Sequence, residues 1–141
     1  MQNTNPQLHP EAAKTLSRWH AMLEQKDFSA LPELLHPEAF FRSPVAHKPY
    51  PGAQAVHLIL STVIQVFENF TYHRELVSED GMSVVLEFSA VVDDKALKGI
   101  DLIRFNEQGL IVEFEVMVRP LSGLQALGAQ MRSRLEHLLP R

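Results

Sequence analysis

The stretch GIDLIRFNEQGLIVEFEVMVRP, residues 99–120, decides the fold. A strand rich in Ile, Leu and Phe runs into a turn at Asn106–Gly109, and a second apolar strand follows it. Aromatic and β-branched residues on both sides of a tight turn predict an antiparallel hairpin. Asp101 lies near the start of the first strand, between Ile100 and Leu102. A carboxylate inside an apolar strand is costly unless it is paired, hydrogen-bonded or protonated.

The spacing of the turns predicts which side chains surround Asp101. It places Asp101 opposite Phe114 in the following strand and opposite Leu86 in the preceding one. Side chains alternate along a strand, so the face that carries Asp101 is otherwise apolar. Its other members are Val84, Leu86, Phe88, Ile103, Phe105, Val112, Phe114, Val116 and Val118. The opposite face mixes charged and apolar side chains: Glu87, Ile100, Leu102, Arg104, Glu113, Glu115, Met117 and Arg119. We expect the apolar face to pack against helices and the mixed face to meet solvent or another subunit.

The rest of the chain predicts helices around this hairpin. Apolar residues at helical spacing predict long helices over Pro10–Lys26 and Gly52–Asn69, and a short helix is expected within residues 27–41, ended by Pro37. The histidine of the polar stripe on the second long helix, His57, is expected to be exposed. Strands are predicted over residues 39–44, 70–79, 82–92, 95–105 and 110–120, and a last helix over 121–139. This order predicts an α+β fold in which a curved antiparallel sheet wraps around helices.

Composition excludes several classes of function. A chain of 141 residues suits one domain, here residues 1–141 with a polar tail over 1–9. A net charge of −4 without a basic run argues against a nucleic-acid partner. No apolar stretch approaches the ~20 residues that cross a bilayer, and the polar N-terminus lacks a signal peptide, so no membrane partner is expected.

Residue types limit the chemistry further. The sequence has no cysteine, which excludes disulfides and thiolate catalysis and agrees with a cytoplasmic location. The seven histidines show no metal-binding spacing. No glycine-rich phosphate loop is present either. The sequence therefore predicts neither a metal nor a cofactor.

Three motifs resemble a known family. RWHAMLEQKD (residues 18–27), LLHPEAFFRSP (34–44) and GIDLIRFNEQGLIVEF (99–114) resemble the corresponding stretches of ketosteroid isomerases. The order of elements resembles the SnoaL-like branch of the nuclear transport factor 2-like superfamily, over Glu11–Pro120. The resemblance implies a single cone-shaped α+β barrel with an apolar pocket, usually dimeric through the outer face of its sheet. It covers a fold that hosts isomerases, dehydratases, cyclases, hydrolases and non-enzymes.

The resemblance also assigns positions to the isomerase residues. Such an isomerase uses an Asp base, and Ser43 stands at that position. It uses a Tyr donor in the first helix, where this chain has Trp19, and a protonated Asp in a late strand, which Asp101 matches. Two supporting Tyr positions correspond to Leu35 and Leu60. A serine hydroxyl is far too weakly basic to remove a proton from carbon, so isomerisation by that mechanism is not expected.

The sequence leaves two possible functions for the protein. In the first, the chain binds an apolar, carbonyl-bearing ligand in an interior pocket and catalyses a cofactor-independent isomerisation, dehydration or cyclisation. Asp101 would be the buried acid and His47, in the loop after the first strand, the base. The residues expected to contact the ligand are Trp19, His20, Ser43, Leu60, Phe114 and Val118.

In the second function, the chain is a non-catalytic binding or dimerisation module. Asp101 is then structural and is paired with an arginine such as Arg42 or with backbone N–H groups. His47 is then a solvated loop histidine, and His20 a half-buried residue of the core. A filled interior and an Asp101–Arg ion pair are the observations that would favour this reading. In both readings we expect a homodimer through the outer face of the sheet.

Overall fold

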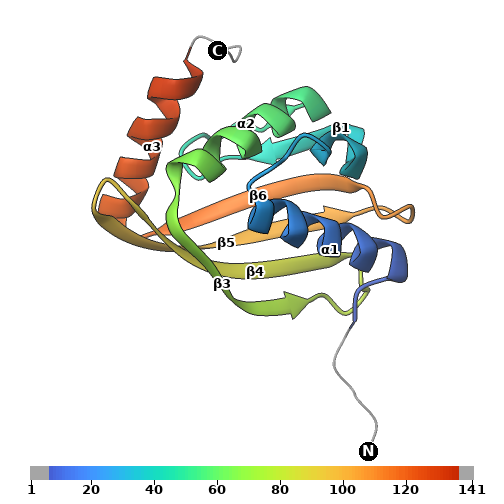
Figure 1. The fold of residues 1–141 in the computed structure, drawn as a ribbon. Helices are drawn as coiled ribbons and strands as arrows, with labels where there is room; N and C mark the ends of the chain where they lie inside the picture. The colour runs from blue at the N-terminus through green and yellow to red at the C-terminus, as the bar shows by residue number, and fades with distance from the viewer. Residues whose placement is uncertain (1–6, 137–141) are drawn as a thin grey trace, which may run out of the picture.

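The computed structural model describes residues 7–136, which form three α-helices, one short 3₁₀ helix and one sheet (Figure 1). The helices are α1 (Pro10–Gln25), the 3₁₀ helix η1 (Leu31–Leu34), α2 (Ala53–Val66) and α3 (Leu121–Leu135). The strands are β1 (Leu35–Arg42), β2 (Tyr50–Pro51), β3 (Glu68–Val77), β4 (Ser83–Val92), β5 (Lys95–Phe105) and β6 (Ile111–Arg119). The predicted end of the last helix, residues 137–139, lies outside the described residues.

The six strands form one mixed sheet in the order β2-β1-β6-β5-β4-β3. Strands β3 to β6 form the expected antiparallel meander, but β1 pairs with β6 in parallel, so the expectation of a wholly antiparallel sheet is corrected. The sheet curves beneath α1 and α2, and α3 lies at one end, where it contacts α2, β5 and β6 (Figure 1). The α+β class is confirmed, with a sheet that is not closed into a barrel.

The short helix expected within residues 27–41 is mostly strand. Only η1 is helical, and β1 begins at Leu35, which pairs with Ile111 of β6. Pro37 follows within the strand, at a shift of register. Proline is tolerated there because a bulge already interrupts the ladder of hydrogen bonds. His36 precedes Pro37 and therefore also lies in β1.

The register of the β5–β6 hairpin differs from the predicted one. Asp101 pairs with Val116 rather than with Phe114, while its predicted pairing with Leu86 in β4 is confirmed. The difference arises at the turn, where a bulge beside Phe105 shifts the pairing. Because the displacement is two residues, every side chain beyond the bulge keeps its predicted face. Beside the bulge itself Ile111 is buried in place of the predicted Val112, which is only half-buried.

The core lies between the inner face of the sheet and the helices. Its largest fully buried side chains are Phe88, Phe114, Leu31, Leu60, Leu86, Ile103, Ile111, Val56, Val84 and Val92. Asp101 lies among them with an exposed fraction of 6%. Within residues 7–136, no helix is long and apolar enough to cross a membrane.

Candidate active site

Within residues 7–136, Asp101 is hydrogen-bonded but has no ion-pair partner. The hydroxyl of Tyr72 donates to its Oδ2 at 2.5 Å. The arginine considered as its partner, Arg42, instead donates from Nε to Oε2 of Glu113 at 3.0 Å. The prediction of an Asp101–Arg42 pair is therefore wrong, and the partner is a neutral phenol.

A third side chain extends this contact into a chain of hydrogen bonds. The indole Nε1–H of Trp19 donates to the Tyr72 oxygen at 3.0 Å. Trp19 comes from α1, Tyr72 from β3 and Asp101 from β5. Tyr72 pairs with Phe88 across β3 and β4, which places it on the same inner face as Asp101. Three separate elements thus meet at the phenol oxygen of Tyr72, a half-buried side chain.

Burial changes the acidity of both titratable members of this chain. Loss of hydration raises the pKa of Asp101 to about 7, although the hydrogen bond from Tyr72 acts in the opposite direction. Burial, together with the negative charge of an ionised Asp101, raises the pKa of Tyr72 well above its usual 10. Tyr72 therefore keeps its hydrogen at neutral pH, while Asp101 changes charge there.

Tyr72 also lines a large hollow, called the large hollow below. This hollow has a volume of about 1280 Å³ and lies between the C-terminal ends of α1 and α2 and the start of β3. Its apolar lining is Leu23, Phe28, Ile64, Phe67 and Phe70, and its polar lining is His20, Glu24, Lys26, Ser29, His57, Ser61, Gln65, Glu68, Asn69 and Tyr72. A concave surface that combines aromatic side chains with polar groups is suited to a small molecule that has both apolar and polar parts.

Comparison with known proteins now identifies the family. The sequence profile of the SnoaL-like domain matches residues 16–114. The chain belongs to the SnoaL-like family. This confirms the resemblance drawn from the three motifs. No match was found among curated proteins.

Solved structures similar to this SnoaL-like protein carry different functional names. A steroid delta-isomerase from Pseudomonas aeruginosa is 60% identical, with a TM-score of 0.92, over 94% of this chain and 97% of that one. An uncharacterised protein with a cystatin-like fold from Silicibacter pomeroyi is 34% identical, with a TM-score of 0.80, over 86% of this chain and 85% of that one. A putative SnoaL-like polyketide cyclase from Jannaschia has a TM-score of 0.69 over 92% of this chain and 99% of that one, but at 12% identity it shows the fold alone.

Three predicted wall residues of the SnoaL-like protein are packed into its core. Trp19, Leu60 and Phe114 are 3%, 2% and 1% exposed, and none of them lines the large hollow. The ring of Trp19 stacks on Phe28 at 5.1 Å between centroids and tilts against Phe114 at 5.2 Å. The interior around these residues is therefore filled, and Trp19 contacts two residues that line the hollow, Phe28 and Tyr72.

Of the two histidines chosen from the sequence, the structure brings only His20 to this site. His20 lines the hollow, and its ring packs edge-on against Tyr72 at 5.4 Å between centroids. Its Nε2 lies 3.6 Å from Oε1 of Glu75. His47 is exposed in the loop after β1 and is not among the residues that line the hollow. The predicted pairing of His47 with Asp101 is not seen.

Ser43 and Val118 lie at other places. Ser43 lines a second hollow of about 440 Å³ under α3, and its Oγ accepts a hydrogen bond from the backbone N–H of Val45 at 3.1 Å. Val118 borders a depression of about 380 Å³ beside Ile100 and Met117. The predicted ligand contacts are thus spread over separate surfaces.

Sequence reasoning missed Tyr72 and placed His57 on the wrong surface. Phe70 and Tyr72 alternate along β3 and both point to the inner face, which is a signal that the sequence carries. A register shift lies between Glu75 and Tyr72, so counting back from the β3–β4 turn does not find the partner of Tyr72. His57 is half-buried in the wall of the hollow, and its Nε2 lies 3.0 Å from the carbonyl of Phe28.

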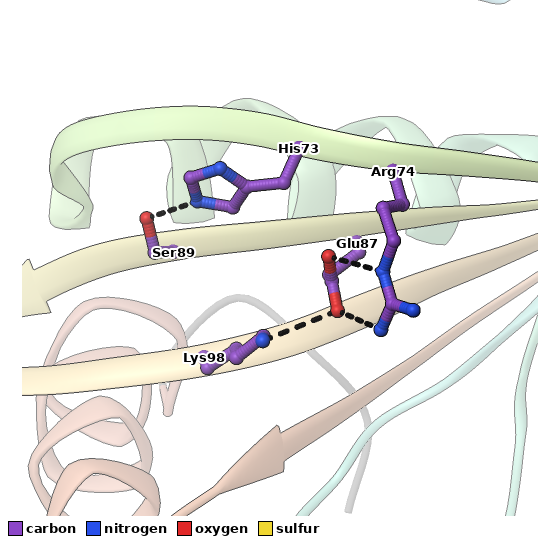
Figure 2. Close-up of polar contacts among 5 residues, drawn as sticks. All are labelled: His73, Arg74, Glu87, Ser89 and Lys98. Carbon is purple, nitrogen blue, oxygen red and sulfur yellow. Dashed lines mark hydrogen bonds and ion pairs between the residues drawn. The ribbon is translucent and has the colours of Figure 1, made fainter.

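The outer face of the sheet carries a separate polar cluster (Figure 2). Both carboxylate oxygens of Glu87 accept hydrogen bonds from Arg74, at 2.9 and 2.7 Å, and the ammonium of Lys98 lies 3.2 Å from Oε2. The Arg74 guanidinium beside it lowers the pKa of Glu87 to about 2. Next to this cluster, His73 Nε2 lies 2.7 Å from Oγ of Ser89. Glu87 is ionised and fully paired, so we assign this cluster to structure rather than to proton transfer.

Proposed function

We propose that this SnoaL-like protein binds a small apolar ligand with a carbonyl group in the large hollow and moves a proton on that ligand without a cofactor. The observation that supports this most is the Trp19–Tyr72–Asp101 chain of hydrogen bonds, whose central residue lines the large hollow. The apolar lining would hold the carbon skeleton, and the hydroxyl of Tyr72 would hydrogen-bond to the carbonyl oxygen.

The same contacts support a reaction through an enolate. Removal of a proton from the carbon beside a carbonyl leaves negative charge on oxygen, and a preorganised donor stabilises that charge. Tyr72 would be this donor. His20 lies in the hollow against Tyr72 and is the nearer candidate for the base, in place of His47. Isomerisation, dehydration and cyclisation all begin with such a step. We propose isomerisation of an unsaturated ketone because the 60% identical relative is named a steroid delta-isomerase.

One observation favours the alternative of a non-catalytic binding or dimerisation module. The interior around Trp19, Leu60 and Phe114 is filled, as that reading requires. Its second requirement, an ion pair between Asp101 and an arginine, is not met, because Tyr72 is the partner. The two functions differ in whether the hollow binds a ketone.

Substitution of Tyr72 by phenylalanine tests the binding site. Tyr72→Phe removes one hydroxyl and keeps the ring, so we expect the Kd for a 5-ene-3-ketosteroid to rise about tenfold, the equivalent of one hydrogen bond. Isothermal titration calorimetry measures this change. Tyr50→Phe, at the only other tyrosine of the chain, is the matched control and should leave the Kd unchanged. An unaltered Kd in Tyr72→Phe would contradict the assignment of Tyr72.

Substitution of the two histidines tests the base. His20→Gln should lower the rate of isomerisation of the same steroid by roughly 100-fold, the usual contribution of a general base. The rate is followed by the ultraviolet absorbance that appears when the double bond becomes conjugated with the ketone. His47→Gln is measured beside it. Loss of activity in His47→Gln alone would return the role of base to His47.

We also propose a homodimer through the outer face of the sheet. Met117 is 46% exposed there, next to the half-buried Ile100 and Leu102, and the depression of about 380 Å³ lies against the Glu87 cluster. An exposed apolar patch rimmed by charge is typical of a subunit contact. Sedimentation velocity at micromolar concentration should show a dimer, and Met117→Glu should shift it to monomer. A wild-type protein that sediments only as a monomer would exclude the dimer.

A further inference from the structure

The number of hydrogens on Tyr72 limits what its hydroxyl can do. An indole N–H is only ever a donor, so the oxygen of Tyr72 must accept from Trp19. The hydroxyl has one hydrogen of its own. The 2.5 Å contact with Oδ2 of Asp101 has room for one hydrogen between its two oxygens. If Asp101 is ionised, that hydrogen has to come from Tyr72, and no hydrogen is left for a ligand.

A protonated Asp101 reverses this contact. Its carboxyl hydrogen can occupy the 2.5 Å contact and be donated to Tyr72. The phenol oxygen then accepts from Trp19 and from Asp101 with its two lone pairs, and its own hydrogen is free. Building on the proposed function, we propose that Asp101 is a positioning residue that acts through Tyr72. Tyr72 donates to a ligand carbonyl only while Asp101 carries a proton.

Few other charges act on this pair. The strand neighbours of Asp101 are Leu86 in β4 and Val116 in β6, both apolar. His20, from α1, packs against the ring of Tyr72. The Nε2 atom of His20 lies 3.6 Å from Oε1 of Glu75, which belongs to β3. Over residues 7–136, no cation is hydrogen-bonded or ion-paired to Asp101. Burial raises the pKa of Asp101 to about 7, so its protonation changes within the neutral range.

Ligand binding should therefore weaken as the pH rises. A neutral ketone is an acceptor without a hydrogen to donate, so it binds only the form in which Tyr72 can donate. The apparent affinity is then proportional to the fraction of protein with a protonated Asp101. With a pKa of about 7, the Kd for a ketone should be about tenfold higher at pH 8 than at pH 6.

The experiment measures binding, not turnover. We would titrate the wild type and Asp101→Asn with a saturated 3-ketosteroid, which has no double bond to isomerise, by calorimetry at pH 6 and pH 8. The asparagine amide carries hydrogens at every pH and can donate to Tyr72 as a protonated carboxyl does. We expect the wild type to bind about tenfold more weakly at pH 8. We expect Asp101→Asn to bind equally at both pH values.

His20→Gln is the control, because His20 lies in the hollow against Tyr72 and this substitution leaves Asp101 in place. It should keep the tenfold difference between pH 6 and pH 8, and loss of the difference there would overturn the role of Asp101. If Asp101→Asn does not fold, the wild type and His20→Gln profiles still decide the question. Equal wild-type binding at both pH values, together with weaker binding by Tyr72→Phe, would overturn this inference and leave the proposed function in place. Absence of binding at either pH would overturn both.

Discussion

The wild-type protein should lose roughly 4 kcal/mol of unfolding free energy between pH 4 and pH 8, and Asp101→Asn should not show this loss. Folding raises the pKa of Asp101 from the usual 3.8 to about 7. Between these values the folded state holds a proton that the unfolded chain has released. Raising the pH therefore favours the unfolded chain until about pH 7, above which the effect is constant.

Urea unfolding at a series of pH values measures this effect as the difference between the two proteins. Subtracting one unfolding free energy from the other cancels the contributions of groups that both proteins share. Glu87 is one such group: its lowered pKa makes it stabilising only as the pH rises above about 2. Asparagine has nearly the shape of aspartate and can keep a hydrogen bond with Tyr72, so the comparison changes mainly the charge. Carboxyl-carbon NMR of the wild type should show Asp101 titrating near neutral pH. Parallel unfolding curves for the two proteins would contradict a buried, neutral Asp101.

Substitution of Gly99 by alanine should destabilise the fold by roughly 3 kcal/mol, the upper part of the range for overpacking a core. Gly99 lies in β5 opposite Phe88. A Cβ at this position would lie 2.6 Å from the ring of Phe88 and would collide with the backbone carbonyl oxygen of Met117. Neither group can move away without a change in the sheet, because one is backbone and the other is fully buried.

Gly128→Ala in α3 is the matched control for Gly99→Ala. A Cβ at Gly128 would meet only the end of the exposed Val45 side chain, at 3.2 Å. Alanine in a helix is favoured over glycine by about 1 kcal/mol, so this variant should be neutral or more stable. Urea unfolding of both variants gives the comparison. Equal stabilities of the two variants would show that the sheet accommodates the methyl group at Gly99.

The Gly99 contact also reaches the proposed site. The ring of Phe88 stacks on Phe70 at 5.0 Å and tilts against Phe67 at 5.4 Å. Phe70 and Phe67 line the large hollow. A methyl group at Gly99 would therefore displace the aromatic wall of the hollow through Phe88. Residual folded Gly99→Ala protein should bind ketones more weakly than the wild type does.

The sequence predicts the inner face of the meander well because side chains alternate regardless of small errors in register. Asp93 and Asp94, with φ of 48° and 61°, form the tight turn expected between β4 and β5, so the pairing of Asp101 with Leu86 could be counted from it. Across the turn between β5 and β6 the predicted register is wrong by two residues, but a shift of two residues keeps Asp101 on the inner face. The sequence alone therefore predicts Asp101 as a single acidic residue on the otherwise apolar inner face of the sheet.

The partners of Asp101 were harder to predict, because they come from distant elements. Tyr72 lies on the edge strand β3, beyond a register shift, and Trp19 approaches from α1. Local patterns do not encode where a helix crosses a sheet. The parallel pairing of β1 with β6 was missed for the same reason, since these strands are far apart in the chain. The resemblance to isomerases supplied the positions of Trp19 and Asp101 but contained no counterpart for Tyr72.

Trp19 is the only tryptophan of the chain, and its indole N–H donates a hydrogen bond to the Tyr72 oxygen, on which the proposed chemistry depends. Indole emission changes with the hydrogen bonding and polarity around the ring. Fluorescence excited at tryptophan therefore arises from one buried position in contact with Tyr72. The fluorescence of unlabelled protein, followed after rapid mixing with a ketone or after a rapid change of pH, should therefore report ligand binding and protonation next to Trp19 in real time. The same measurement on Tyr72→Phe would show how much of the fluorescence change depends on the Tyr72 hydroxyl.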